Sequence, residues 1–306
     1  MALVTVAALA LTGSPASAAV TIGSSLQIDP NDSGSIEATY VQTSLPGGGI
    51  VSSPIDGVIT RWRMRGYTQG ATPAEILFRV MRPAGTGTFT AISSTSALLP
   101  TTLGTYEFPA RVPIQSGDYI GLTQTPGNTA FIDCDGCPGV GADEFFSGPF
   151  ADNQTRSATP VNDELVPINA NVEPDADKDG YGDETQDRCP VDPNTQGLCQ
   201  ISFGKLKRNT KKGTAILPVT VPGAGTLSLS GKGLVKQRAA GAYRAARADK
   251  TVAGAGTVKL LVEPKGKARR KLNRAGRARV KAIVTYTPSG APPVAQPKRV
   301  KLIKQH

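Results

Sequence analysis

The sequence predicts an all-β protein built from two β-sandwich domains, and three observations support this. Several stretches alternate apolar and polar residues with a period of two, which is the pattern of half-buried strands. The chain has 34 glycines and 24 prolines among 306 residues but only 5% aromatic residues, which favours short strands and turns over helical bundles. Charge also divides the chain: residues 1–200 carry 9 basic and 22 acidic side chains, whereas residues 201–306 carry 25 and 2. We therefore place a domain boundary near residue 200.

Residues 1–18 have the pattern of a secretory signal peptide. The run from Ala2 to Leu11 is almost wholly apolar, Gly13 and Pro15 interrupt a helix, and Ala16-Ser17-Ala18 supplies the small residues of a cleavage site. This run is shorter than the ~20 residues that a membrane-spanning helix needs, and no later stretch suits a transmembrane segment. We expect a secreted, extracellular protein or one held in the cell envelope.

Four cysteines fit an exported protein: Cys134 and Cys137, then Cys189 and Cys199. In an oxidising compartment an even number of cysteines indicates disulfides. Proximity in the sequence favours Cys134–Cys137 and Cys189–Cys199 among the three possible pairings. Zinc binding or thiol redox chemistry is the alternative, although a four-cysteine zinc site needs CxxC spacing twice.

Histidine chemistry is almost excluded, because the one histidine, His306, is the last residue. Catalytic triads and the HExxH zinc motif both require histidine. The sequence also lacks the GxSxG and GxGxxG motifs. We expect a protein that is not an enzyme. A glycan hydrolase remains a minor alternative, because its paired carboxylates leave no sequence signature.

The N-terminal domain, residues 19–172, is expected to be a jelly-roll-like sandwich, because its short strands are separated by turn sequences such as LPGGG at 45–49. The predicted strands span 57–67, 74–81, 105–109 and 118–124.

Two features of this domain have alternative interpretations. Arg61, Arg63 and Arg65 share one face of the first predicted strand. A solvated face that discourages edge pairing is the favoured interpretation, and binding of an anionic polymer or sugar is the alternative. The acidic, aromatic and glycine-rich segment 131–146 is expected to be a loop. We interpret it as a decorated turn, with a ligand-binding loop pinned by a disulfide as the alternative.

Alternating aspartates mark the segment between the domains, residues 173–200. Three carboxylates at alternate positions of an irregular loop can turn toward one point, and without a cation they would repel one another. Calcium takes six to eight oxygen ligands, and Gly180 permits the sharp turn after which a backbone carbonyl can coordinate. Magnesium demands stricter geometry and keeps its waters, so calcium (Ca2+) is the predicted ion. The candidate ligands are Asp175, Asp177, Asp179, Asp183, Asp187 and the carbonyl of Tyr181.

Residues 173–199 resemble the thrombospondin type 3 repeat, in which DxDxDGxxDxxDxC binds calcium and the following cysteines are disulfide-bonded. The resemblance implies that the first four of these aspartates are side-chain ligands and that Tyr181 gives a carbonyl. The last aspartate of the family is twelfth in the loop, but here Gln186 is twelfth and Asp187 thirteenth. Either the loop carries a one-residue bulge or Asp187 does not coordinate.

The C-terminal domain, residues 201–306, is expected to be a basic immunoglobulin-like sandwich. Its run 256–290 resembles the Lys/Arg-rich sandwich repeats attached to many secreted actinobacterial proteins. Residues 235–252 are expected to form a short helix or a mobile loop. The predicted strands span 213–221, 226–230, 256–263, 278–288 and 299–303.

The charge of this domain suggests its partners. Aromatic residues that could stack on bases are limited to Phe203, Tyr243 and Tyr286, and no nucleic-acid-binding motif is visible. Anionic cell-wall polymers or glycans are therefore favoured over a bare solvated surface and over nucleic acid.

Together these features predict a secreted or envelope-associated, non-catalytic protein. Calcium would rigidify its linker, and its basic domain would adhere to anionic polymers. A carbohydrate-binding module on the N-terminal sandwich is the alternative.

Overall fold

The computed structural model describes residues 18–34, 36–127, 129–137, 142–234, 237–238 and 250–305. This part of the chain is mostly β-strand in several antiparallel sheets, which confirms the predicted all-β, sandwich-type fold. The predicted signal peptide lies outside the described residues except for Ala18, and the segment 235–252 lies mostly outside them. In the described part, no helix is both long enough and apolar enough to cross a membrane.

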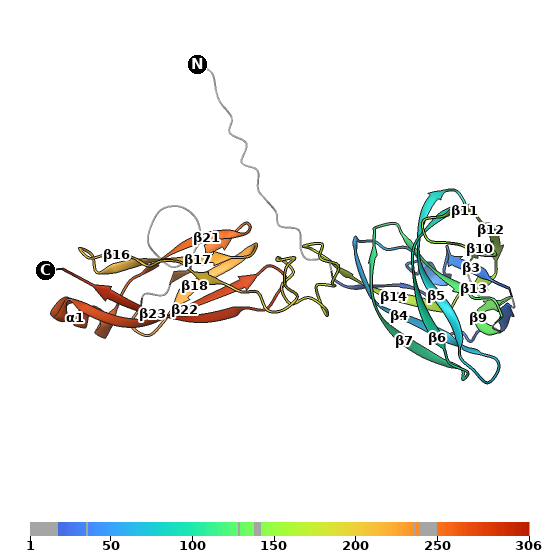
Figure 1. Ribbon diagram of the computed structural model, residues 1–306, viewed down its shortest axis with the longest axis horizontal. Helices are drawn as coiled ribbons and strands as arrows, with labels where there is room; N and C mark the ends of the chain where they lie inside the picture. Colours follow the sequence, from blue (N-terminus) through green and yellow to red (C-terminus); the bar gives the residue numbers. More distant parts are fainter. Residues whose placement is uncertain are drawn as a thin grey trace, which may run out of the picture.

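Two antiparallel sheets form the N-terminal part of the structure (Figure 1). The first sheet has the order β1 (Val20–Gly23), β14 (Ile168–Pro174), β4 (Gly57–Thr68), β9 (Ala130–Asp135), β13 (Glu164–Leu165), with β2 (Asp32–Gly34) paired to β9 and β7 (Gly104–Ile114) paired to β4. The second has the order β11 (Thr155–Ser157), β6 (Thr88–Leu99), β5 (Ala74–Gly85), β8 (Tyr119–Gln124), β3 (Ala38–Gln42), β10 (Ala142–Ser147), β12 (Thr159–Asn162). A short 3-10 helix, Pro46–Gly48, follows β3.

The apolar faces of these two sheets share one core. Trp62 on β4 stacks on Phe78 on β5 with ring centroids 5.1 Å apart, and both side chains are fully buried. On the opposite face of β4, the three arginines are ion-paired. Glu107 accepts from Arg61 at 3.1 Å and Arg63 at 2.7 Å, and Asp29 pairs with Arg65. These ion pairs give the three arginines a structural role within the N-terminal part of the structure.

Strands β5 and β7 continue beyond their predicted ends. The prolines that suggested an end lie at positions where a missing N–H interrupts no strand pairing. In β7, Pro109 and Pro113 lie on a strand that pairs only with β4, and an edge strand tolerates a missing N–H. In β5, Pro83 lies beyond Met81, where the pairing with β8 ends.

The expectation of a loop over 131–146 was wrong for most of its length. Residues Ala130–Asp135 form β9 and Ala142–Ser147 form β10. Buried Ile132 and Phe146 supply the strand pattern, which the acidic and glycine residues around them obscure.

Two further sheets form the C-terminal part. One has the order β15 (Ser202–Phe203), β17 (Thr214–Val221), β16 (Lys207–Asn209), with β21 (Gly256–Val262) paired to β17. The other has the order β19 (Gln237–Arg238), β18 (Gly225–Ser230), β22 (Arg277–Pro288), β23 (Val294–Ile303), with β20 (Lys250–Val252) paired to β18. Leu217 on β17 and Val284 on β22 belong to one buried cluster, so these sheets also share a core.

One helix was not expected. The segment α1 (Gly266–Ala275) is rich in lysine and arginine, and its Leu272 is buried in the C-terminal core. Gly276 ends this helix with φ of 65°, the left-handed conformation that favours glycine. The single apolar anchor explains why the sequence pattern did not reveal a helix.

Candidate metal centre

The acidic linker begins as a direct continuation of β14. Strand pairing continues through Glu173 and Pro174, opposite Val58 and Gly57, so the sheet extends two residues past the predicted boundary at 172. The linker returns to this strand, because the backbone nitrogen of Asp183 donates to the Pro174 carbonyl at 2.9 Å. One end of the loop is therefore fixed to the N-terminal sheet.

Glu173 fixes the returning part of the linker, residues 184 and 185, to the end of β14. Its side chain is 2% exposed and accepts hydrogen bonds from the backbone nitrogens of Glu184 (3.0 Å) and Thr185 (2.9 Å) and from two threonine hydroxyls, those of Thr60 (3.0 Å) and Thr185 (2.6 Å). A Cβ on Gly182 would lie 2.5 Å from Glu173 Oε2, so only glycine allows this close approach.

Asp175, Asp177 and Asp179 converge within the loop. Each offers one carboxylate oxygen, and these oxygens all lie within 4.8 Å of one another. Asp175 accepts from the backbone nitrogens of Asp179 (3.1 Å) and Gly180 (2.9 Å), and Asp179 accepts from that of Tyr181 (2.9 Å). These hydrogen bonds close the loop and hold two of the three carboxylates in place.

Asp177 and Asp187 have buried carboxylate oxygens without a hydrogen-bond partner. Both oxygens of Asp177 and Oδ2 of Asp187 are buried without a hydrogen-bond partner, and Asp187 is only 2% exposed. Burial, then the charges of Asp179, Asp187 and Asp175, raises the pKa of Asp177 to about 6. Burial is also the main cause that raises the pKa of Asp187, with further contributions from Asp179 and Asp175. Three carboxylate oxygens thus lie together in the loop, and burial and neighbouring negative charges disfavour the charged forms of Asp177 and Asp187.

The remaining predicted ligands lie close to this cluster. Asp183 accepts from the Ala176 backbone nitrogen through both oxygens at 3.2 Å, and burial followed by the charges of Asp175, Asp177 and Asp187 raises its pKa to about 7. The ring of Tyr181 lies under the Arg111 guanidinium, 4.3 Å from its centroid. The Tyr181 carbonyl stays a predicted ligand.

Gln186 is engaged elsewhere. Its Nε2 donates to the Ala110 carbonyl at 2.8 Å, and its Oε1 accepts from the Gly182 nitrogen at 3.2 Å. The backbone nitrogens of Gln186 and Asp187 both donate to the Gly182 carbonyl, at 3.0 and 2.8 Å. The Gln186 side chain is therefore engaged away from the aspartate cluster, and Asp187 stays a predicted ligand.

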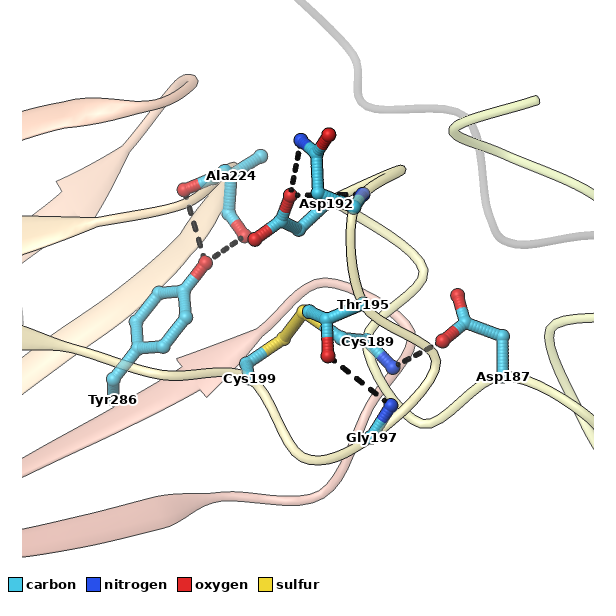
Figure 2. Close-up of a disulfide and its surroundings, with 10 residues drawn as sticks. Asp187, Cys189, Asp192, Thr195, Gly197, Cys199, Ala224 and Tyr286 are labelled. Atoms are coloured by element: carbon cyan, nitrogen blue, oxygen red, sulfur yellow. Dashed lines mark hydrogen bonds between the residues drawn. A yellow bond between two sulfur atoms is a disulfide. The ribbon is translucent and has the colours of Figure 1, made fainter. Parts of the chain in front are cut away.

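The other end of the linker is built into the C-terminal core through a disulfide (Figure 2). Cys189 and Cys199 pair with a Cα separation of 4.9 Å, and both are buried. A Cβ on Gly223 would lie 2.5 Å from the Val191 Cβ, so this loop packs tightly on the turn before β18. Gln196, within the disulfide loop, donates to Asp179 Oδ2 at 2.8 Å. The disulfide loop therefore contacts the aspartate cluster directly.

The second cysteine pair also agrees with the prediction. Cys134 and Cys137 are paired at the end of β9, with Cα atoms 5.8 Å apart. No cysteine of the chain is free, which supports the disulfide interpretation over a four-cysteine zinc site.

The donor set fits a hard divalent cation. Every convergent atom is a carboxylate oxygen, and calcium prefers oxygen ligands in a flexible arrangement. An uncompensated cluster of buried carboxylates is costly, and a cation would remove that cost. Asp175, Asp177, Asp179 and Asp187 would hold the ion. The carboxylate of Asp183 accepts a hydrogen bond from the loop backbone at Ala176.

Two residues that support the loop were not predicted, Glu173 and Gln196. Neither occupies a position of the motif, because their hydrogen-bond partners are backbone groups or residues far away in the sequence.

Comparisons with known proteins identify no family for this chain. No family model matches it, and no curated protein shows significant similarity to it.

Proposed function

We propose that this chain is a secreted or envelope-associated, non-catalytic calcium-binding protein. Calcium rigidifies the linker between its two sandwiches, and the basic C-terminal sandwich adheres to anionic surface polymers. The two disulfides support an oxidising, extracellular location.

The observation that carries the calcium proposal is the set of buried oxygens without partners on Asp177 and Asp187. Buried polar groups in folded proteins nearly always have a hydrogen-bond partner, so each exception requires an explanation. Here the exceptions belong to carboxylates beside Asp175 and Asp179, and a bound cation supplies the missing partner.

The position of the loop indicates what the ion does. Asp183 is tied to Pro174 at the end of the N-terminal sheet, whereas Asp187 precedes the disulfide of the C-terminal core. An ion shared by ligands on both sides would resist bending at this junction. Its role is therefore structural.

The adhesion proposal rests on one face of the β22–β23 hairpin, which we call the basic ladder. Arg279 lies directly opposite Lys301, and Lys281 directly opposite Arg299. All four side chains are exposed and line one surface pocket. Like charges placed directly opposite each other destabilise a sheet, and no ion pair among the described residues involves these four. An extended polyanion along the hairpin would neutralise them.

Thermal unfolding of the full chain tests the calcium proposal. With millimolar calcium the transition should rise by several degrees relative to excess chelator, because a ligand that binds only the native state stabilises it. Asp177→Asn should remove the part of the shift that the linker ion contributes. Identical transitions for the wild-type protein in calcium and in chelator would contradict the proposal.

Retention on dextran sulfate, compared with uncharged dextran, tests the basic ladder. Changing Arg279, Lys281, Arg299 and Lys301 to glutamine should abolish retention at salt concentrations where the wild type binds. A matched control changes four exposed lysines elsewhere in the domain, Lys205, Lys207, Lys211 and Lys212. Equal losses in both variants would show that net charge, not the ladder, drives adhesion.

A further inference from the structure

A second acidic cluster lies at one end of the N-terminal sandwich, far along the sequence from the linker. Asp133 on β9 and Glu164 on β13 belong to the first sheet, and Asp143 on β10 belongs to the second. Asp133 is 2% exposed and Asp143 is 1% exposed. Glu164 lies near enough to Asp143 for its charge to act on that carboxyl group. The cluster therefore contains carboxyl groups from both sheets.

The strand register places like charges opposite each other twice. Asp32 on β2 faces Asp133 across one ladder, and Glu164 faces Asp135 across another. Directly opposed like charges destabilise a sheet. Asn31 nevertheless fixes this arrangement, since its side chain accepts from the Asp135 nitrogen at 2.9 Å and donates to the Asp135 carbonyl at 3.0 Å. The fold holds the charges together instead of separating them.

The buried oxygens of this cluster have no donors. Both oxygens of Asp143, Oδ1 of Asp133 and Oε2 of Glu164 are buried without a hydrogen-bond partner. None of the ion pairs among the described residues includes these three residues. A buried carboxylate with neither a donor nor a counter-ion is strongly disfavoured, so the site requires a cation or bound protons.

The electrostatics of the neighbouring groups agree with this geometry. Burial, followed by the charges of Asp32, Glu164 and Asp135, raises the pKa of Asp133 to about 7. Burial and the charges of Glu164, Asp133 and Glu144 raise that of Asp143 to about 8. Burial, and then the surrounding carboxylates, beginning with Asp133, also raises the pKa of Tyr40 on β3 above its ordinary value.

We propose that Asp133, Asp143 and Glu164 bind a second divalent metal ion, of the calcium class, between the two N-terminal sheets. Oxygen-only donors select a hard cation. Asp133 and Asp143 lie too deep for the ammonium or guanidinium group of a partner protein to reach. Asp32, which is exposed and faces Asp133, marks the side from which the ion enters.

Ion entry requires a small rearrangement. Among the described residues, only Asp175, Asp177 and Asp179 have three ligand oxygens within 4.8 Å of one another, so the oxygens of this second cluster are further apart. A cation would draw the carboxylates together and link β9 to β10 across the sandwich. It would therefore stabilise the N-terminal domain separately from the linker.

Equilibrium dialysis of the full chain against radioactive calcium at millimolar concentration tests this proposal. The wild type should bind one ion more than Asp143→Asn, whereas Asp163→Asn, an exposed neighbour of Glu164 with the same charge change, should bind as many as the wild type. Asp177→Asn identifies the linker ion separately. If only Asp177→Asn lost an ion, the buried carboxyl groups would share protons and the second site would be refuted. If only Asp143→Asn lost an ion, the second site would stand and the linker proposal would fail.

A terbium measurement covers the case in which Asp143→Asn does not fold. Terbium replaces calcium at oxygen sites and luminesces when a nearby tyrosine absorbs light. Tyr40→Phe and Tyr181→Phe should each remove a different part of the tyrosine-sensitised signal of the wild type. An unchanged signal in Tyr40→Phe would contradict the second site.

Discussion

The carboxylate of Asp187 accepts a 2.8 Å hydrogen bond from the backbone nitrogen of Cys189 (Figure 2). One oxygen of this aspartate is thereby fixed against the buried disulfide, while the other has no hydrogen-bond partner. Only Arg188 thus separates Asp187 from Cys189 in the C-terminal core. Any ion that binds Asp187 together with Asp175 and Asp179 connects that core to the loop that leaves the N-terminal sheet.

This relationship predicts which residue completes the calcium site. Asp187→Asn should lower calcium affinity at least tenfold, because it removes a charged oxygen that is already desolvated. Gln186→Ala should leave affinity nearly unchanged, since the Gln186 side chain is bonded to Ala110 and Gly182. Calorimetric titration of both full-length variants measures the difference. The reverse order of affinities would place Gln186 in the site.

Removal of the second disulfide should weaken both the C-terminal domain and calcium binding. The bond closes a short loop with a sequence separation of 10, and its loss is expected to cost about 2–4 kcal/mol in denaturant-induced unfolding. Cys189→Ala combined with Cys199→Ala also frees Asp187, so calcium affinity should fall as well. Unchanged affinity in a folded variant would show that Asp187 is positioned by other contacts.

Gly182 should tolerate no side chain. A Cβ there would lie 2.5 Å from Glu173 Oε2 and 2.6 Å from Thr60 Cγ2, so Gly182→Ala is expected to cost about 1–3 kcal/mol through overpacking. Gly197→Ala is the matched control, because its nearest contact, Thr195 Oγ1, lies at an ordinary 3.6 Å. Equal unfolding free energies for the two variants would argue against this packing.

Glu173 should contribute more stability than its exposed neighbour Glu184. Glu173→Ala leaves two backbone nitrogens and two threonine hydroxyls without their acceptor, and hydrogen bonds to charged groups contribute about 1.5–3 kcal/mol each. We expect a loss of at least about 2 kcal/mol by chemical denaturation. Glu184→Ala, at an exposed position, should change stability by about 0.5 kcal/mol or less.

The sequence revealed much of this fold because the pattern of buried residues has a simple period. Buried residues alternate with more exposed ones along all of β22 and from Thr60 onward in β4, and both strands were predicted. In β6, a run of serine and threonine from Ser93 to Ser96 interrupts the apolar pattern, so the strand was missed. The helix α1 was missed because it buries only Leu272.

The candidate metal centre was predicted from the local spacing of its aspartates and from the resemblance to the thrombospondin type 3 repeat. Asp175, Asp177 and Asp179 meet because they alternate within one loop, and the structure brings them together. Contacts between residues far apart in the sequence could not be predicted. Gln196 donates to Asp179 across 17 positions, and Asp143 comes near Glu164 only because the two N-terminal sheets pack together. Whether the N-terminal sandwich binds carbohydrate stays a prediction.

Calorimetric titration of the metal-free full chain with calcium tests the central claim most directly. Wild-type protein should give a saturable binding heat, with a dissociation constant of the order of 10⁻⁴–10⁻³ M that is expected of extracellular calcium modules. The heat assigned to the linker should disappear in Asp177→Asn and persist in Asp163→Asn. The same heat in the wild type and in Asp177→Asn, or none in either, would contradict the account.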